Sequence, residues 1–268
     1  MPTRDEAWPQ GTPCWVDVQV DDLEAARAFY SGLFGWDIQD SSEDAGGYLM
    51  ASLKGKSVAG LGPKPEGMPV PSAWTTYLAA DSADEVAAKI TAAGGQNFMP
   101  PFDVMDAGRM FVATDSTGAA FGVWEAKTHT GAGIFNEPGA YVWNELHTRN
   151  YAAAKKFYTE VFGYSYNEVG DGEHMIYSTF ALPGAAGPED NVGGFGDDSK
   201  QPGEGAYWLT WFASDDTEAT IAKAQELGAT VMMPAEETPF GHMGIVAGPQ
   251  GEVFGVINVG RTQAPAAQ

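Results

Sequence analysis

Two residues in the second half of the chain have the types and spacing for acid–base chemistry, Glu145 and His147. They are two positions apart, so in a β-strand their side chains project from the same face. A carboxyl group buried beside indoles has a raised pKa, and an imidazole titrates near neutrality, so the pair could serve as general acid and base. Each also has a structural interpretation, as part of a rim network or as a satisfied polar residue. Asp17 and Gln19 hold the matching positions in the first half, so the halves are predicted to differ in chemistry.

Tryptophan recurs near these polar residues, and an indole offers both stacking area and one N–H donor. Alternation along the strands predicts that one face of each opening strand carries a tryptophan and lines the concave side of a sheet. The same indoles could instead fill sheet curvature as core. The candidate ligand-binding residues on this concave side are Trp15, Asp17, Trp74, Trp143 and Trp208, with Thr76 and Thr210 beside the second and fourth indoles.

Two basic residues, Arg109 and His242, each follow a glycine near the start of a predicted strand. They could bind a carboxylate or phenolate of a ligand, or they could be solvated charges at a rim. His242 is expected to face the cup of Glu145 or the neighbouring cup. No role is assigned to His129 or to His174.

The chain repeats itself. Trp143 follows Trp15 by 128 residues, and Phe254-Gly255-Val256 follows Phe121-Gly122-Val123 by 133. A small drift between two parallel series is what loop insertions between duplicated domains produce. We predict a first domain at 11–127, a linker at 128–138, a second domain at 139–260 and a flexible tail at 261–268.

Each half divides again into a strand, a helix and further short strands. Asp21 or Asp22 can cap a first helix that Gly35 ends, and Asn150 and Gly163 repeat this pattern. Shorter helices are expected before 94–95 and before 228. Such an order does not suit a doubly wound parallel sheet, where every strand needs a crossover helix. The prediction is an α+β fold of four βαβββ modules, in which curved mixed sheets form cups with the helices outside.

Bulk properties exclude several classes of function. The formal net charge of −22 repels nucleic acid and anionic lipid. The single cysteine cannot form an internal disulfide, the N-terminus lacks the apolar run of a signal peptide, and no stretch is long and apolar enough to span a bilayer. A cytoplasmic protein, monomeric or homodimeric, with neither nucleic-acid nor membrane partners is expected.

From about Gly11 to Gly260 the sequence resembles the vicinal oxygen chelate superfamily of glyoxalases, bleomycin-resistance proteins and extradiol dioxygenases. The resemblance depends on the helix openings and exits and on the turns after two strands, and it is greatest to double-domain actinobacterial members described as hydroxylases or glyoxalase-like proteins. The segments that carry it are 11–17, 22–30, 34–36, 106–110, 115–118, 162–164 and 248–251.

In metal-dependent members of that family, the first strand of a module supplies His or Gln and the last strand supplies Glu. Mapping these positions onto the chain gives only indoles and glycines, which cannot coordinate a metal through their side chains. The resemblance therefore implies no metal at the family site, and we expect no cofactor. The mapped positions are Trp15, Trp74, Gly122, Trp143, Trp208 and Gly255, together with 58–60 and 192–194.

Two functions remain open at this point. The first is a metal-free binding protein that holds a small aromatic or polyketide-type molecule in tryptophan-lined cups, in antibiotic resistance or biosynthesis. The alternative is an enzyme of the same fold, a hydroxylase, cyclase, isomerase or glyoxalase-like lyase, that uses Glu145 and His147 for acid–base catalysis. A surface or signalling interaction has no feature of its own in the sequence.

Overall fold

The computed structural model describes residues 2–41, 46–65, 67, 70–170, 172, 175–201 and 203–261. In the first half the elements are β1 (Pro13–Val20), α1 (Leu23–Phe34), β2 (Asp37–Asp40), β3 (Leu49–Leu53), β4 (Lys56–Pro63), β5 (Ala73–Ala79), α2 (Ala83–Ala92), β6 (Gln96–Asn97), β7 (Phe102–Val104), β8 (Gly108–Thr114) and β9 (Ala120–Ala126). The predicted tail lies, except for Arg261, outside the described residues, and so does His174.

The second half repeats this order with β10 (Tyr141–Thr148), α3 (Tyr151–Phe162), β11 (Ser165–Glu168), β12 (Tyr177–Ala181), a 3₁₀ turn η1 (Pro188–Asp190), β13 (Asn191–Asp197), β14 (Tyr207–Ala213), α4 (Thr217–Glu226), β15 (Thr230–Thr238), β16 (Gly241–Ala247) and β17 (Val253–Asn258). Each half therefore contains two strand–helix–strand modules. The predicted repeat of modules is present in the described residues.

Each half of the chain forms one mixed sheet. The strand order is β2-β3-β4-β1-β5-β9-β8-β6 in the first sheet, with β7 paired to β8, and β11-β12-β13-β10-β14-β17-β16-β15 in the second. Within a module the first strand runs parallel to the last, as in β1–β4 and β5–β9, and the two modules meet through the antiparallel pair β1–β5. The α+β prediction is confirmed.

The long helices begin and end at the residues that the sequence indicates. Asp22 and Asn150 accept hydrogen bonds from the backbone N–H groups of Ala25 and Ala153, and so cap α1 and α3. Both helices end at a glycine in the left-handed conformation, with φ 70° at Gly35 and 76° at Gly163.

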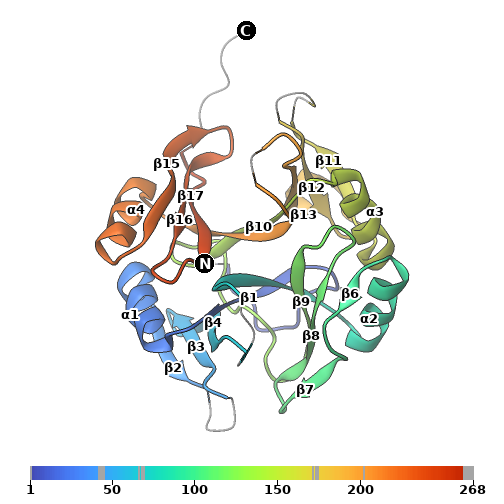
Figure 1. The fold of residues 1–268 in the computed structure, drawn as a ribbon, viewed down its shortest axis with the longest axis horizontal. Helices are drawn as coiled ribbons and strands as arrows, with labels where there is room; N and C mark the ends of the chain where they lie inside the picture. Colours follow the sequence, from blue (N-terminus) through green and yellow to red (C-terminus); the bar gives the residue numbers. More distant parts are fainter. Residues whose placement is uncertain are drawn as a thin grey trace.

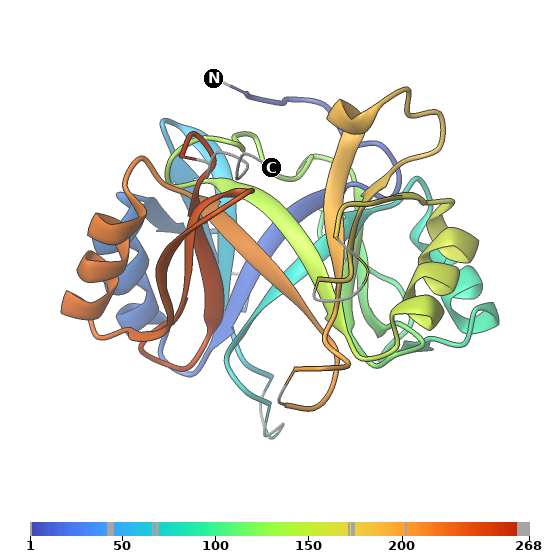
Figure 2. The same ribbon diagram turned by 90° about the horizontal axis from the view of Figure 1, so that it is seen from above.

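The four helices lie on the flanks of the molecule, where α1 packs beside α4 and α2 beside α3 (Figure 1). Figure 2 shows these two helix pairs at opposite ends of the paired sheets. Each pair therefore joins one module of the first half to one module of the second.

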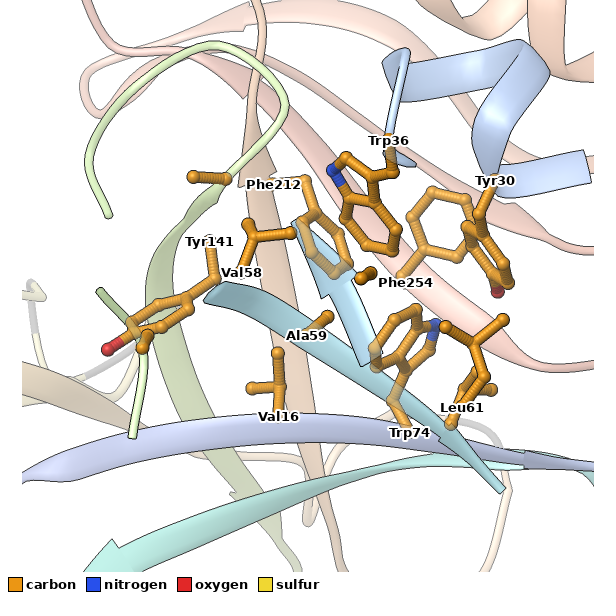
Figure 3. Packing of buried hydrophobic residues seen from close by; sticks show 14 of the residues in the cluster. Val16, Tyr30, Trp36, Val58, Ala59, Leu61, Trp74, Tyr141, Phe212 and Phe254 are labelled. Carbon is orange, nitrogen blue, oxygen red and sulfur yellow. The ribbon is translucent and has the colours of Figure 1, made fainter. Parts of the chain in front are cut away.

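Aromatic side chains from both halves form the core under α1 and α4. Trp74 and Trp36 pack on Phe212 with ring centroids 5.0 and 5.7 Å apart, and Tyr30 lies 6.0 Å from Phe254 (Figure 3). All are nearly fully buried, except that Trp74 retains 7% exposure. Both halves therefore contribute rings to this core.

The two sheets meet back to back. Asn144 of β10 accepts hydrogen bonds at its Oδ1 from the hydroxyls of Thr76 on β5 and Thr210 on β14, each 2.9 Å long. Since side chains alternate along a strand, the neighbours of Asn144 and Thr76 in sequence must point to the outer faces of the sheets. The concave faces of the two sheets therefore open on opposite sides of the molecule.

The linker runs across one end of the first sheet. Ala132 donates its backbone N–H to the carbonyl of Cys14, and Gly133 donates to that of Ser57. The ring of His129 lies edge-on to Trp15 and Trp124, with centroids 4.5 and 5.4 Å apart. The first sheet is thus covered at this end by the linker.

Candidate functional site

The concave face of the first sheet carries a hydrogen-bonded cluster that we call the first cup, made of Trp15, Asp17, Tyr48 and Tyr77. The indole N–H of Trp15 donates to the hydroxyl of Tyr48 over 3.0 Å. Tyr48 and Tyr77 both donate to Oδ2 of Asp17, over 3.1 and 2.9 Å. The structure brings Trp15 and Asp17 together as the sequence suggested.

The second sheet repeats this arrangement in a cluster that we call the second cup, made of Trp143, Glu145, Tyr177 and Trp211. Trp143 donates to the hydroxyl of Tyr177 over 2.8 Å, and Tyr177 donates to Oε2 of Glu145 over 2.7 Å. The indole of Trp211 donates to Oε1 over 2.8 Å. Duplication has therefore preserved an indole–phenol–carboxylate chain on both concave faces.

The second cup has an extension that the first lacks. His147 places Nε2 3.0 Å from Oε1 of Glu145 and Nδ1 3.1 Å from Oδ1 of Asp198. The imidazole stacks on Tyr207 with a centroid separation of 5.0 Å and an interplanar angle of 9°. His147 is therefore held on three sides, between two carboxylates and a phenol ring.

These contacts decide the charges in the second cup. Burial opposes the imidazolium of His147, but the hydrogen bonds to Asp198 and Glu145 outweigh it and raise the pKa to about 10. Burial also acts to raise the pKa of Glu145, yet the hydrogen bond and charge of His147 hold it below the ordinary value. The expected raised pKa of Glu145 was wrong in direction, because an imidazolium lies beside it. At neutral pH both residues are charged.

Asp17 is the carboxyl group whose pKa is raised. Burial raises the pKa of Asp17 to about 7, although the hydrogen bonds from Tyr77 and Tyr48 act to lower it. Oδ1 of Asp17 is buried and has no hydrogen-bond partner among the described residues. The group that titrates near neutrality thus lies in the first cup.

The predicted inward orientation of Trp74 and Trp208 was wrong. Trp74 packs edge-on against Tyr30 of α1, and Trp208 donates its indole N–H to Tyr158 of α3 over 2.9 Å. Both indoles lie under the helices, on the opposite face from the cups. The alignment was one residue out: Trp15 pairs directly with Tyr77 across β1–β5, and a shift of one residue moves a side chain to the other face.

Arg109 and His242 also point away from the cups. Arg109 of β8 makes a two-pronged ion pair with Asp84 of α2, with N–O distances of 3.0 and 3.1 Å. His242 of β16 is buried, its Nε2 lies 3.9 Å from Glu218 of α4, and its backbone carbonyl accepts from Thr217. The strand phase turns both side chains toward the helices rather than toward the cups, and their binding of a ligand stays an untested prediction.

Sequence reasoning missed several residues of the cups. The signal that could have found them is a glycine on the strand next to each cup residue. In the parallel pairs, Asp17 lies beside Gly60 and Tyr77 lies beside Gly122, so aligning the modules on these glycines identifies the residues that line the cup. The residues missed in this way are Tyr48, Tyr77, Tyr177, Asp198, Tyr207 and Trp211.

Four glycines lie beside cup residues, at strand positions where a metal ligand would be expected. They are Gly60, Gly122, Gly194 and Gly255. A Cβ at Gly60 would lie 1.8 Å from the hydroxyl of Tyr48, and one at Gly194 would lie 1.8 Å from that of Tyr177. A Cβ at Gly122 or Gly255 would lie 2.1 Å from the ring of Tyr77 or Trp211. Aromatic rings thus fill the space that a ligating side chain on these strands would need.

The residues present do not fit a divalent ion held by imidazole and carboxylate. Two ligands of one ion must be neighbours, and the strand positions adjacent to the four glycines are Asp17, Tyr77, Glu145 and Trp211 rather than the four tryptophans first mapped. Among the described residues, no three His, Cys, Asp or Glu side chains are grouped to hold a metal.

Outside the cups, a cavity of about 230 Å³ lies between the N-terminal segment and the ends of β5 and β9, lined by Ala7, Trp8, Cys14, Ala79, Ala80, Asp81, Trp124, Glu125, Ala126 and Thr130.

No helix in the described part of the chain is long and apolar enough to cross a bilayer.

The fold and its paired concave faces define a class of protein, and comparison with known families agrees. The chain belongs to the Glyoxalase/Bleomycin resistance protein/Dioxygenase superfamily, whose model matches residues 14–123 and 140–256. The resemblance seen in the sequence is thereby confirmed.

Among individual relatives, the protein named "Putative glyoxylase CFP32" from Mycobacterium tuberculosis (strain CDC 1551 / Oshkosh) is 41% identical over 96% of this chain and 98% of its own length. Anthracycline biosynthesis protein DnrV from Streptomyces peucetius is 34% identical over 96% of both chains. The Mn(II)-bound glyoxalase from Novosphingobium aromaticivorans is 19% identical, with a TM-score of 0.62 over 96% of this chain and 89% of that one, and supports the fold alone.

Proposed function

We propose that this protein binds a planar organic molecule in the second cup, without a metal ion. The observation that carries the proposal is that the polar atoms at the floor of the cup already have partners. The N–H groups of Trp143 and Trp211, the hydroxyl of Tyr177 and both oxygens of Glu145 bond to one another. Such a floor offers ring faces rather than free hydrogen-bonding groups, so it favours an apolar, flat ligand.

The rim of the second cup supplies further aromatic surface. Tyr207 is 47% exposed while it stacks on His147, and Phe240, from the turn between β15 and β16, is 39% exposed. The ring of Phe240 lies 5.8 Å from that of Tyr177, although β12 and β16 are far apart in the sheet order. The curved sheet thus brings exposed rings together around one space.

The names of two relatives support a fused-ring ligand. Two relatives are named anthracycline biosynthesis proteins, DnrV at 34% identity and DauV at 33%. Each alignment covers 96% of this chain and 96% of the relative. Anthracyclines contain a flat, fused-ring system, which matches a surface built from indole and phenol rings. We therefore extend the proposal to polycyclic aromatic molecules of the polyketide type, in antibiotic biosynthesis or resistance.

The acid–base alternative has less support from the geometry. A general base must be free to accept a proton, whereas His147 is an imidazolium at neutral pH and donates to two carboxylates. Glu145 is ionised, and its two oxygens accept three hydrogen bonds or ion-pair contacts. The second cup is thus better suited to binding than to proton transfer.

Tryptophan fluorescence of metal-stripped protein, titrated with 9,10-anthraquinone, which has no hydroxyl donor, tests the proposal. We expect saturable quenching, and Phe240→Ala or Tyr207→Ala should weaken binding about tenfold, equivalent to about 1.4 kcal/mol. Phe98→Ala is the matched control, because Phe98 is 56% exposed in the first half, away from the second cup. Quenching that is unaffected by Phe240→Ala and Tyr207→Ala would exclude the second cup as the site.

The same samples test whether binding needs a metal ion and whether the bound compound is chemically changed. Binding should be the same after addition of Ni, Zn or Fe(II), and mass spectrometry should recover the compound unchanged. If binding appeared only with metal, the metal-free proposal would be wrong. If the compound were altered and Glu145→Gln abolished its conversion but not its binding, the enzymatic alternative would replace it.

A further inference from the structure

The two carboxylates of the cups differ in how their oxygens are used. In the second cup, Oε2 of Glu145 accepts from Tyr177, while Oε1 accepts from Trp211 and contacts Nε2 of His147. Both oxygens of this carboxylate are therefore satisfied within the protein.

In the first cup, both phenol donors reach the same oxygen. Tyr48 and Tyr77 donate to Oδ2 of Asp17, and Oδ1 is left without a partner among the described residues although Asp17 is only 4% exposed. A buried carboxylate oxygen without a hydrogen bond is costly. Oδ1 is therefore a buried polar atom of the first cup that accepts no hydrogen bond from a described residue.

Comparison with the second cup indicates which kind of group would bond to Oδ1 of Asp17. Gln19 pairs with Gly62 as His147 pairs with Gly196, so Gln19 stands where the second cup has its imidazolium. Tyr77 stands where the second cup has Trp211, but it donates to the other oxygen. The two groups that contact Oε1 of Glu145, Trp211 and His147, are both donors, so the matching partner of Oδ1 in the first cup must be a donor.

We propose that the first cup binds a neutral molecule with a phenolic or enolic hydroxyl, which donates its hydrogen bond to Oδ1 of Asp17. Phenols are already the partners of this carboxylate, since Tyr48 and Tyr77 bond to it over 3.1 and 2.9 Å. The indoles of Trp15 and Trp124 are buried at the same end of the sheet, in edge contact with the ring of His129, and they enclose the cup on that side.

Charge favours a neutral donor over a cation. The imidazolium of His147 is held by a second carboxylate, Asp198, which follows Asp197 of β13. The register of the first sheet places Lys64 at that position, and its ammonium is bound to Asp21 over 2.6 Å. A cationic ligand would therefore lack the second counter-charge that stabilises His147.

Tyr48 is the accessible side of the first cup. Among the residues of the first cup, Tyr48 is partly exposed while Trp15, Asp17 and Tyr77 are buried. Its ring lies over the backbone of β4, where a Cβ on Gly62 would come within 3.2 Å of it. Tyr48 is therefore the residue of the first cup that an entering molecule would contact first.

The sign of the pH dependence follows from the groups around Asp17. The ionised carboxylate is the better acceptor, and burial places its pKa at about 7. Tyr48 and Tyr77 remain protonated, because burial raises the pKa of both well above the ordinary value, and burial lowers the pKa of His129 to about 4, so it stays neutral. Affinity for a hydroxyl donor should therefore rise as the pH increases from 5.5 to 8.

Phenol and anisole form the matched probes, because anisole keeps the ring and the oxygen but lacks the O–H donor. By NMR titration of the full chain at pH 8, phenol should bind at least tenfold more tightly than anisole. Asp17→Asn should remove this difference, whereas Asp37→Asn, at an exposed carboxylate of β2, should leave it unchanged. Gln19→His should also weaken phenol binding, because the new imidazole can occupy Oδ1 from within as His147 does.

Each opposite outcome overturns the proposal. Equal binding of phenol and anisole, affinity that falls as the pH rises, or a preference for phenol that survives in Asp17→Asn would show that Oδ1 accepts no hydroxyl. Loss of the preference in Phe240→Ala but not in Asp17→Asn would place the hydroxyl site in the second cup. Because the two cups lie on opposite sides of the molecule, this inference does not depend on the proposed function, and the variants report on each site separately.

Discussion

Asp17 makes the free energy of unfolding depend on pH. Its pKa is raised by burial to about 7 in the folded chain, from an ordinary value of 3.8, so its protonated form is favoured by folding. The stabilisation is complete below about pH 4 and is lost as the pH rises through 7. Asp17→Asn should therefore gain about 2 to 3 kcal/mol relative to the wild type between pH 5 and 7.5, measured by urea unfolding.

For Glu145→Gln we expect the opposite dependence of the free energy of unfolding on pH. The imidazolium of His147 keeps the pKa of Glu145 below its ordinary value, so this carboxylate stabilises the fold above that value and ceases to do so as the pH falls. The destabilisation caused by Glu145→Gln should shrink in acid. If both variants showed the same trend with pH, the assignment of charge in the two cups would be wrong.

His147 should contribute most to stability in mildly acidic solution. Its pKa is about 10 in the folded chain against 6.5 ordinarily, so its stabilisation is fully present below pH 6.5 and disappears as the pH rises through 10. Removing one member of a buried, paired set of charges costs about 3 kcal/mol. We expect His147→Gln to lose about that amount at pH 6 and less than half of it at pH 10, by the same unfolding measurement.

A surface ion pair provides the control for this prediction. Lys156 and Glu160 are exposed on α3 and lie 3.8 Å apart, so Lys156→Gln should change the free energy of unfolding by less than about 0.5 kcal/mol at pH 6. A pH-independent loss in His147→Gln would mean that the imidazole acts by packing on Tyr207 and not by charge.

At the scale of elements, the two helix-ending glycines separate backbone strain from steric clash. Gly35 has φ 70° and open space around the position of a Cβ, whereas a Cβ at Gly163, φ 76°, would come within 2.9 Å of Pro183. Gly35→Ala should cost about 1 kcal/mol through the left-handed conformation alone. Gly163→Ala should cost more, and thermal unfolding of the two variants measures the difference. Equal costs would show that the proline moves freely.

The same glycines explain why the order of the elements could be predicted. Helix signals are local: Asp22 and Gly35, or Asn150 and Gly163, mark the two ends of a helix within a dozen residues. Those boundaries needed no knowledge of the rest of the fold. The duplication supplied a second copy of each signal, and so strengthened the prediction.

Strand phase was harder to predict, because it depends on partners that are distant in the sequence. Trp74 lies in a strand, β5, of which both faces are largely buried, so alternation gave no sign of which face the indole occupies. Edge strands were missed for a related reason: β15 contains Pro234 and two glutamates, and pairs on one side with β16. The pKa values of Asp17 and Glu145 could not be predicted for the same reason. Each depends on burial and on phenol or imidazole groups that only the fold brings close to the carboxyl group.

For the whole molecule, the buried bond of Asn144 should couple the two halves. Its Oδ1 accepts from Thr76 of the first sheet and Thr210 of the second. Asn144→Leu leaves both hydroxyls unpaired at the interface between the sheets, at a cost of about 2 to 4 kcal/mol. Thr76→Val removes one donor and should cost less, because Thr210 still satisfies the acceptor.

The shared cores predict that the halves unfold together in spite of being a duplication. Phe121 of the first half packs on Tyr158 of the second with centroids 5.7 Å apart, and Trp74 packs on Phe212, so each helix pair covers rings from both halves. Residues 1–137 expressed alone would expose these rings to water and should lack near-ultraviolet circular dichroism, while co-expression with 138–268 should restore it. In the intact chain, urea unfolding followed by tryptophan fluorescence and by far-ultraviolet circular dichroism should give coincident single transitions, and Asn144→Leu should shift both equally. Two separable transitions, or an isolated half with native near-ultraviolet signals, would mean that each sheet is stable without its partner and that the common aromatic core contributes little to the cooperativity of the fold.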